Sequence, residues 1–101
     1  MYKKIINPIA ELNYRLDGID NKYLINDGKR SLGMFAATQG IIVPSQITTG
    51  DLAFYILEGA MEISLEDKTF ALKTGEMLLI PKATAYTLNF TENAKIITIR
   101  M

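Results

Sequence analysis

The chain has 101 residues with 11 basic and 11 acidic side chains, and 49% of its residues are hydrophobic. This length supports one domain with one core, since a chain of this size buries only about 60–68% of its unfolded surface. The composition is typical of a globular protein, and the balanced charge lacks the basic excess that binds nucleic acid or an anionic bilayer. We therefore expect neither nucleic acid nor a membrane as a partner.

Two residue types are missing from the sequence, and each absence excludes a kind of chemistry. No cysteine is present, which excludes disulfides and thiolate sites and is compatible with a reducing compartment. No histidine is present, so a Ser-His-Asp triad is impossible. Residues 1–8 hold too few apolar side chains for a signal peptide or a membrane span. We expect a cytoplasmic protein.

The first predicted elements are strands joined by turns. Residues 11–16 alternate polar with apolar side chains, which predicts a half-buried strand that ends at a turn formed by residues 17–18. Residues 23–25 and 32–38 are rich in apolar side chains and flank Asn-Asp-Gly at residues 26–28. Because Asp-Gly can supply the positive φ angles of a tight turn, these two segments are predicted to form a hairpin.

Further along the chain, six segments of β-branched and aromatic residues are separated by turn residues about every eight to twelve positions. The apolar runs 54–57 and 77–80 fit strands that are covered on both faces. Gly59 and Gly75 fall where the chain must turn sharply, and Pro81 suits a strand end because it has no amide hydrogen. This pattern predicts an all-β sandwich or barrel. The six predicted strands are residues 51–57, 60–65, 69–72, 77–80, 85–90 and 95–100.

Two stretches, residues 46–59 and 75–86, resemble the two conserved motifs of the cupin superfamily. The first ends in Tyr-Ile-Leu-Glu-Gly, similar to the aromatic-Val-Leu-x-Gly run of that family, and the second begins with Gly-x5-Pro. The resemblance implies an all-β, single-domain cupin-like β-barrel or jelly roll, also called a double-stranded β-helix. One domain would span residues 1–101, with residues 1–29 as N-terminal strands or an extension and residues 30–100 as the conserved barrel.

The resemblance also identifies positions where the family holds a metal ion, and this sequence departs from the motif there. The family's ligands, mostly histidines, would fall on Gln46, Thr48, Leu52 and Tyr86. Amide and hydroxyl oxygens are weak ligands for borderline divalent ions, leucine has no donor, and tyrosine would have to lose its proton. Asp51 is adjacent to the carboxylate position, but strand alternation turns it to the opposite face. We expect no bound metal and no cofactor. A further departure is an alanine at position 83, where the family has glycine.

The same positions are candidates for a ligand pocket. Alternation in a barrel would direct the side chains of residues 46, 48, 52, 54 and 56 inward, facing those of residues 84, 86, 88 and 90. A mostly apolar pocket with a few hydrogen-bonding groups is typical of a small-molecule site. The alternative is a packed core that Tyr86 closes with its hydroxyl at the surface. The pocket candidates are Gln46, Thr48, Leu52, Phe54 and Tyr86.

Three functions remain open on the sequence alone. The first is a metal-free, cupin-like protein that binds or senses a small organic ligand without catalysis. The second is a small enzyme, an isomerase or lyase acting on a sugar or a small organic acid through Tyr86 and a carboxylate. The third is a structural interaction domain. The acidic side chains at turns and alternate strand positions are more typical of solvated faces than of paired catalytic acids: Glu58, Glu62, Glu66, Asp67 and Glu76.

Self-association is expected under each of these functions. Small barrels leave edge strands whose unpaired backbone groups favour pairing, and proteins resembling this one are commonly dimers. We therefore expect a homodimer, with residues 2–9 as a candidate segment for packing against a neighbour. Lys82, next to Pro81 near the barrel mouth, could bind an anionic substrate, although an exposed loop lysine is equally expected there.

Overall fold

The computed structural model describes residues 3–16 and 18–101. Within these ranges no helix is long and apolar enough to cross a membrane. The described elements are one short helix, α1 (Pro8–Glu11), and the strands β1 (Ile19–Asn26), β2 (Ser31–Ala37), β3 (Ile42–Ile47), β4 (Leu52–Glu58), β5 (Ala60–Ser64), β6 (Thr69–Lys73), β7 (Met77–Ile80), β8 (Ala85–Asn89) and β9 (Ala94–Arg100).

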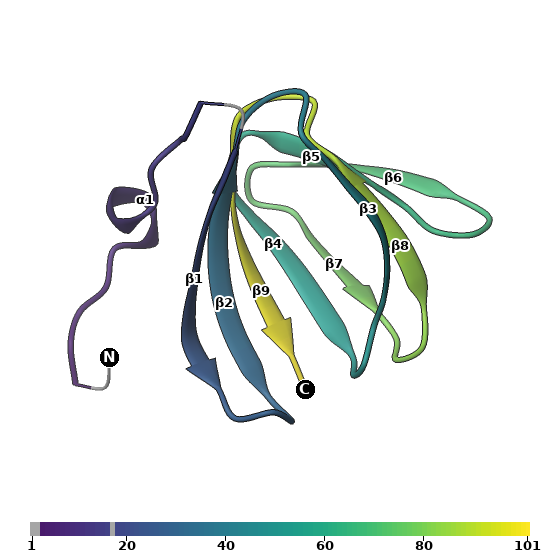
Figure 1. The fold of residues 1–101 in the computed structure, drawn as a ribbon, viewed down its shortest axis with the longest axis horizontal. Coiled ribbons are helices and arrows are strands. Elements are labelled where there is room, and N and C mark those ends of the chain that lie inside the picture. Colours follow the sequence, from purple (N-terminus) through teal and green to yellow (C-terminus); the bar gives the residue numbers. More distant parts are fainter. Residues whose placement is uncertain (1–2, 17) are drawn as a thin grey trace.

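The strands form two antiparallel sheets that face each other. The first sheet has five strands in the order β1-β2-β9-β4-β7, and the second has four in the order β3-β8-β5-β6. Figure 1 shows α1 outside the first sheet, beside β1 and away from the second sheet. The chain crosses repeatedly from one sheet to the other, as it does between β4 and β5. The predicted all-β jelly-roll barrel is confirmed.

The predicted hairpin at residues 26–28 is also confirmed, since β1 and β2 pair antiparallel on either side of it. Gly28 has a φ of 88°, as the turn requires. The Asp27 carboxylate closes the turn, because its Oδ1 accepts hydrogen bonds from the backbone N–H groups of Lys29 and Arg30 at 3.1 and 2.8 Å. The Arg30 backbone bond is the largest cause that lowers the pKa of Asp27 to about 2.

The prediction of a strand at residues 11–16 is wrong. Asn7 caps a helical turn instead, its Oδ1 accepting from the Ala10 N–H at 3.3 Å, and Pro8 occupies the first helical position. The following residues carry no strand. Leu12 and Tyr14 pack on the outer face of the first sheet, where Leu12 is 2% exposed, whereas Leu16 is 94% exposed. Alternating burial arises here from contact with a sheet face and not from strand pairing. Residues 2 and 17 of the earlier predictions lie outside the described residues.

A buried lysine fastens this N-terminal segment to the barrel. Lys95 on β9 points to the outer face, is 9% exposed, and donates from Nζ to the Ile9 carbonyl at 2.7 Å. Its Nζ also lies 3.8 Å from the Glu58 carboxylate, which accepts a hydrogen bond from the Tyr14 hydroxyl. Burial is the largest cause that raises the pKa of Tyr14 far above its ordinary value. The described part of the segment thus lies against its own barrel.

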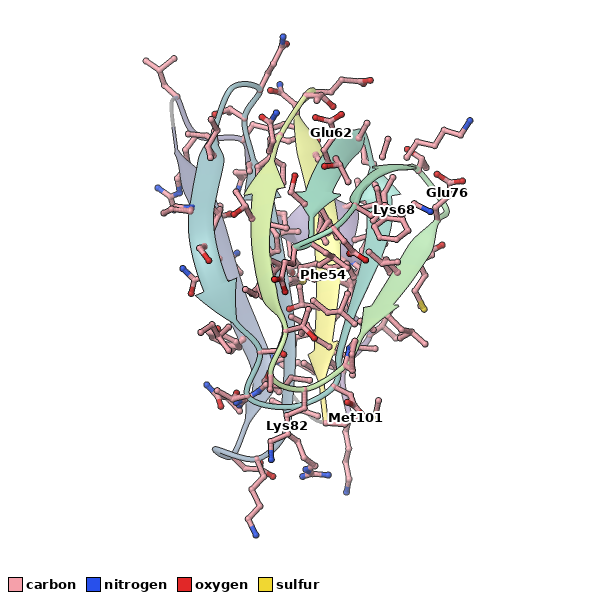
Figure 2. All side chains as sticks on the ribbon, turned by 90° about the vertical axis from the view of Figure 1, so that its right-hand side faces the viewer. Phe54, Glu62, Lys68, Glu76, Lys82 and Met101 are labelled. Carbon is pink, nitrogen blue, oxygen red and sulfur yellow. The ribbon has the colours of Figure 1, made fainter. Side chains whose placement is uncertain are left out.

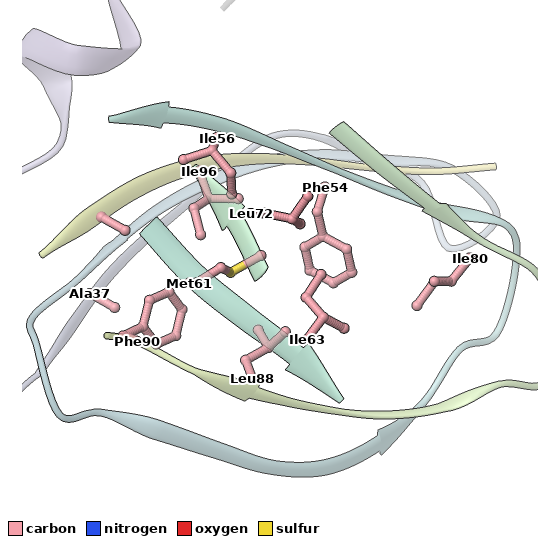
Figure 3. Close-up of a cluster of buried hydrophobic side chains, with 11 residues drawn as sticks. Ala37, Phe54, Ile56, Met61, Ile63, Leu72, Ile80, Leu88, Phe90 and Ile96 are labelled. Atoms are coloured by element: carbon pink, nitrogen blue, oxygen red, sulfur yellow. The ribbon is translucent and has the colours of Figure 1, made fainter. Parts of the chain in front are cut away.

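The hydrophobic core fills the space between the two sheets (Figure 3). On β4 the inward side chains Phe54 and Ile56 are 1% and 0% exposed, in line with the predicted alternation. Phe90 and Phe35 meet edge to face with ring centroids 5.8 Å apart. Figure 3 shows Phe90 beside Ala37 at one end of this cluster, which closes that end of the barrel.

The expectation that both faces of residues 77–80 are covered is wrong. Leu78 and Ile80 pack against the core, but Met77 and Leu79 are 53% and 67% exposed. The physical reason is topological: β7 is the edge of the first sheet, and the N-terminal segment covers the outer face only over β1, β2 and β9. An apolar run therefore identifies a strand here without proving that it is central.

Candidate functional site

A cavity of about 350 Å³ lies between the two sheets at the end where β2 begins and β9 finishes. Figure 2 shows Lys82 and Met101 at this end of the barrel, with Phe54 deeper between the sheets. Side chains from β1, β2, β4 and β9 line one wall, and side chains from β3 and β8 line the other. Phe54 and Leu88 belong to both the lining and the core, so they form the floor. The size is at the small end for ligand pockets, which run from about 300 to 1,000 Å³.

All five pocket candidates from the sequence lie in this lining, but their roles differ. Leu52 is half-buried and Phe54 is buried, so both supply apolar surface. Gln46 is exposed at the rim, and its Nε2 donates to the Pro44 carbonyl of its own strand at 3.3 Å. β3 and β8 bring Gln46 and Tyr86 together as direct partners across the second sheet.

The hydroxyl of Thr48 is committed to the backbone and not to the cavity. Thr48 is 6% exposed. Its Oγ1 donates to the Pro81 carbonyl at 2.8 Å and accepts from the Thr84 N–H at 2.9 Å. Backbone bonds from Thr48 N–H to the Thr84 carbonyl and from Ala83 N–H to the Thr48 carbonyl complete the junction. Thr48 therefore fastens the loop before β8 to the end of β3.

Tyr86 is half-buried in the wall of the cavity. Its ring stands edge to face with Phe54, with centroids 5.5 Å apart and planes at 71°. Burial raises the pKa of Tyr86 above its ordinary value, and the neighbouring Tyr23 adds to the effect. The phenol therefore stays protonated at neutral pH. Tyr86 lines the cavity, and within the described ranges its hydroxyl has no hydrogen-bond partner, so its donor and its acceptor capacity are both available.

The other side chains expected on the inward face separate into core and cavity. Ile56 and Phe90 are fully buried in the core, whereas Leu88 reaches the cavity floor. Thr84 does not line the cavity, because the corner before β8 places it beside Thr48, where its backbone N–H meets the threonine hydroxyl. Alternation matches the lining on β8, where Tyr86 and Leu88 face inward, but not at the end of β3, where consecutive residues 46–50 all line the cavity.

Sequence reasoning missed Arg100, the one charged side chain among the lining residues that the structure describes. It lies near the end of β9, opposite Ser31 on β2 and Leu52 on β4. Its Nη1 donates to the Thr49 hydroxyl at 2.7 Å, and its Nε donates to the Ser31 hydroxyl at 3.3 Å. The available signal was alternation along β9, since Thr98 and Arg100 continue the inward series that begins with buried Ala94 and Ile96.

The residues at the expected metal positions do not fit a divalent transition metal. Thr48 spends its hydroxyl on two backbone groups, Gln46 is turned to its own strand, and Leu52 has no donor atom. The raised pKa of Tyr86 opposes the deprotonation that metal binding requires. In the part of the chain that the structure describes, no group of three or more histidine, cysteine, aspartate or glutamate side chains could hold a metal ion.

The acidic side chains lie elsewhere on the molecule. Glu58 is on the outer face with Tyr14, Glu62 receives a bond from Asn89 at 3.4 Å, and Glu76 accepts from the Lys73 N–H at 2.9 Å. Glu66 and Asp67 form the exposed turn between β5 and β6. No aspartate or glutamate appears among the described residues that line the cavity.

Comparison with solved structures places the fold among small cupins. A conserved protein of unknown function from Streptococcus pyogenes superposes with a TM-score of 0.93 at 18% identity, covering 100% of this chain and 89% of that one. A cupin superfamily protein from Desulfitobacterium hafniense gives 0.89 at 19% identity, covering 98% and 92%. The EutQ protein of Clostridium difficile gives 0.70 at 18% identity, covering 81% and 66%. At these identities the likeness concerns the fold.

The sequence itself supplies the family assignment. No curated protein matches it significantly. A family model does match, over residues 20–101, and its description is ethanolamine utilisation protein EutQ. This range begins in β1 and includes every later strand together with all the side chains of the cavity except Ile19. The chain belongs to the EutQ family of the cupin superfamily.

Proposed function

We propose that this protein binds or senses a small organic molecule in the cavity between its sheets, without a metal and without catalysis of its own. The observation that carries the proposal is the Tyr86 hydroxyl, which faces a cavity of about 350 Å³ without a hydrogen-bond partner among the described residues. A half-buried polar group without a protein partner is favourable when a ligand or water completes its bonds. The apolar floor of Phe54 and Leu88 supplies the desolvated surface that such a ligand needs.

An enzyme working through Tyr86 and a carboxylate is less well supported. The described lining holds no aspartate or glutamate to act as the second group. The raised pKa of Tyr86 suits a hydrogen-bond donor better than a general base at neutral pH. A purely structural interaction domain is also less well supported, because its interior would be packed.

Nuclear magnetic resonance tests the proposal directly. The uniformly ¹⁵N-labelled protein is titrated with small sugars, polyols and organic acids, and amide shifts are followed on β3, β8 and β9. We expect at least one compound to shift amides around the cavity selectively. Tyr86→Phe should weaken binding of that compound, whereas Tyr55→Phe, on β4 of the other sheet and outside the cavity lining, should leave its affinity unchanged. Equal affinity of the two variants would contradict the assignment of Tyr86.

Metal analysis provides an independent check. The purified protein is exposed to iron, manganese, nickel and zinc salts and then desalted, and the bound metal is quantified. We expect far less than one equivalent, because the donor set around Tyr86 is poor for these ions. Stoichiometric metal would refute the metal-free part of the proposal.

We also propose that the chain forms a homodimer in which the edge strand β7 pairs with the β7 of a second copy. Two observations support this: the exposure of Met77 and Leu79, and the position of β7 at the edge of the first sheet. Antiparallel pairing of β7 with its copy would use the same patch on both subunits, as twofold symmetry requires. Light scattering should give a dimer for the native chain and a monomer for Leu79→Lys. A native monomer at micromolar concentration would contradict the proposal.

A further inference from the structure

The guanidinium of Arg100 places a positive charge in the wall of the cavity. Arg100 is half-buried in the cavity wall, and its two hydrogen bonds go to the neutral hydroxyls of Thr49 and Ser31. No ion pair joins Arg100 to any carboxylate of the described residues. The two hydroxyls orient the side chain and leave the other N–H groups of the guanidinium available.

The loop before β4 holds this arginine in place. A Cβ added at Gly50 would overlap the Met101 carbonyl oxygen and would lie 3.3 Å from the Cγ of Arg100. Asp51 and Met101 exchange two backbone hydrogen bonds, at 3.1 and 2.9 Å, which tie this loop to the end of β9. The cation is therefore positioned by closely packed backbone and not by a flexible loop.

The cavity leaves that positive charge unbalanced. Arg100 is the only charged side chain among the described residues of the lining. A charge withdrawn from water is costly unless it is paired, and a planar guanidinium pairs best with a planar carboxylate through two parallel hydrogen bonds. A single cation matches a single negative charge, whereas a phosphate monoester would bring a second charge without a partner.

Neutral polar groups surround the arginine. Thr98 precedes it on the inward face of β9, and Tyr23 and Asn21 line the wall from β1. The ring of Tyr23 lies across the sheet over Gly33, whose lack of a side chain makes room for it, as an added Cβ there would lie 3.2 Å from that ring. Together with Tyr86, these groups can bond to several hydroxyls of a ligand.

We propose that the cavity binds a small monocarboxylate bearing hydroxyl groups, with its carboxylate on Arg100 and its hydroxyls toward Tyr86 and Thr98. This inference rests on the proposed function and specifies its ligand class. Ethanolamine, named in the description of the family, carries an ammonium group at neutral pH and is a poor partner for a cavity whose described lining has a guanidinium and no carboxylate.

A matched pair of probes tests the charge. Gluconate and sorbitol have the same carbon chain and differ in the carboxylate, so their affinities, measured by amide shifts of the ¹⁵N-labelled protein, isolate its contribution. We expect gluconate to bind at least about 10-fold more tightly than sorbitol, as charge-assisted hydrogen bonds imply. Ethanolamine should shift no cavity amides. Equal binding of gluconate and sorbitol, or tighter binding of inorganic phosphate than of gluconate, would overturn the proposal.

Two variants that each remove one positive charge test the position. Arg100→Gln should weaken the binding of gluconate by roughly 10-fold to 100-fold and should leave the affinity for sorbitol nearly unchanged. Lys82→Gln removes a charge from an exposed loop outside the lining and should change gluconate affinity less than about twofold, since exposed charges are screened by salt. If the two variants behave alike, Arg100 is not the anchor.

Further controls show whether the variants are folded and which of the two proposals a negative result contradicts. A dispersed amide spectrum establishes that Arg100→Gln is folded, and Arg100→Lys, which keeps the charge but loses the bidentate fork, should give an intermediate affinity. If neutral probes shift the cavity amides and no carboxylate does, the inference about charge fails while the proposed function stands. If no probe of any kind shifts these amides, the proposed function fails as well.

Discussion

Replacing Thr48 with valine tests whether this buried residue stabilises the fold or contacts a ligand. The substitution keeps the shape of the side chain and removes only the hydroxyl, which donates to Pro81 and accepts from Thr84. Both backbone groups lose a partner. The Pro81 residue is exposed and its carbonyl can turn to water, but the Thr84 N–H lies at a half-buried corner.

The size of the effect follows from these two losses. A buried polar group left without a partner costs about 1–3 kcal/mol, and a group that reaches water costs much less. We therefore expect Thr48→Val to lower the free energy of unfolding by about 2 kcal/mol. For a domain of this length, 1 kcal/mol corresponds to about 4–8 °C in Tm, so the midpoint should fall by roughly 8–16 °C.

The assay is urea unfolding followed by circular dichroism, with Thr98→Val as the matched control. Thr98 also lines the cavity, but its hydroxyl has no hydrogen-bond partner among the described residues, so this variant should stay within about 0.5 kcal/mol of the native chain. If both variants are equally stable and Thr48→Val loses ligand affinity, Thr48 is a ligand contact and the structural role is wrong.

Three further predictions concern the rest of the fold. Gly59 and Gly75 share a φ near 86°, but of the two only Gly59 lies where an added Cβ would overlap a backbone carbonyl. In urea unfolding, Gly75→Ala should lower the free energy of unfolding by about 1–2 kcal/mol, and Gly59→Ala should lower it by more. Equal losses of stability would contradict the steric argument. Lys95→Met removes the hydrogen bond from the lysine to the Ile9 carbonyl, which fastens the N-terminal segment. Amide hydrogen exchange should therefore become faster in residues 3–16 and stay unchanged in the sheets. Unchanged exchange throughout would refute this role of Lys95. The pKa of Asp27 is lowered to about 2, so the stabilisation by its carboxylate is present above about pH 4 and is lost as the pH falls toward 2. In Asp27→Asn the free energy of unfolding should therefore depend less on pH in this range. If the native chain and the variant lose stability in parallel, Asp27 does not contribute.

The sequence alone was sufficient for most of the strands and for the family resemblance, although it wrongly predicted a strand at residues 11–16 and did not identify β3. Segments such as 85–90 combine β-branched and aromatic residues with period-two alternation, and turn residues bound them, so their conformation depends mostly on neighbours in sequence. The hairpin at residues 26–28 is equally local, because the Asp27 carboxylate bonds to amides two and three residues ahead. The departure of the four metal positions from the family's histidines and carboxylate was likewise readable directly, since it depends on residue identity and not on geometry.

The three-dimensional arrangement decided which of these side chains remain available for a ligand. Thr48 and Tyr86 looked equivalent as hydrogen-bonding candidates, but a corner that brings Pro81 and Thr84 to Thr48 uses one hydroxyl, while the other stays open to the cavity. Alternation along β9 could have placed Arg100 on the inward face, but its isolation from carboxylates depends on which strands surround it. Residues 11–16 showed the alternation of a strand, but Leu12 and Tyr14 are covered because they lie on a sheet, and Leu16 is exposed. Periodicity reports which side chains are buried, whereas only long-range packing determines what they touch.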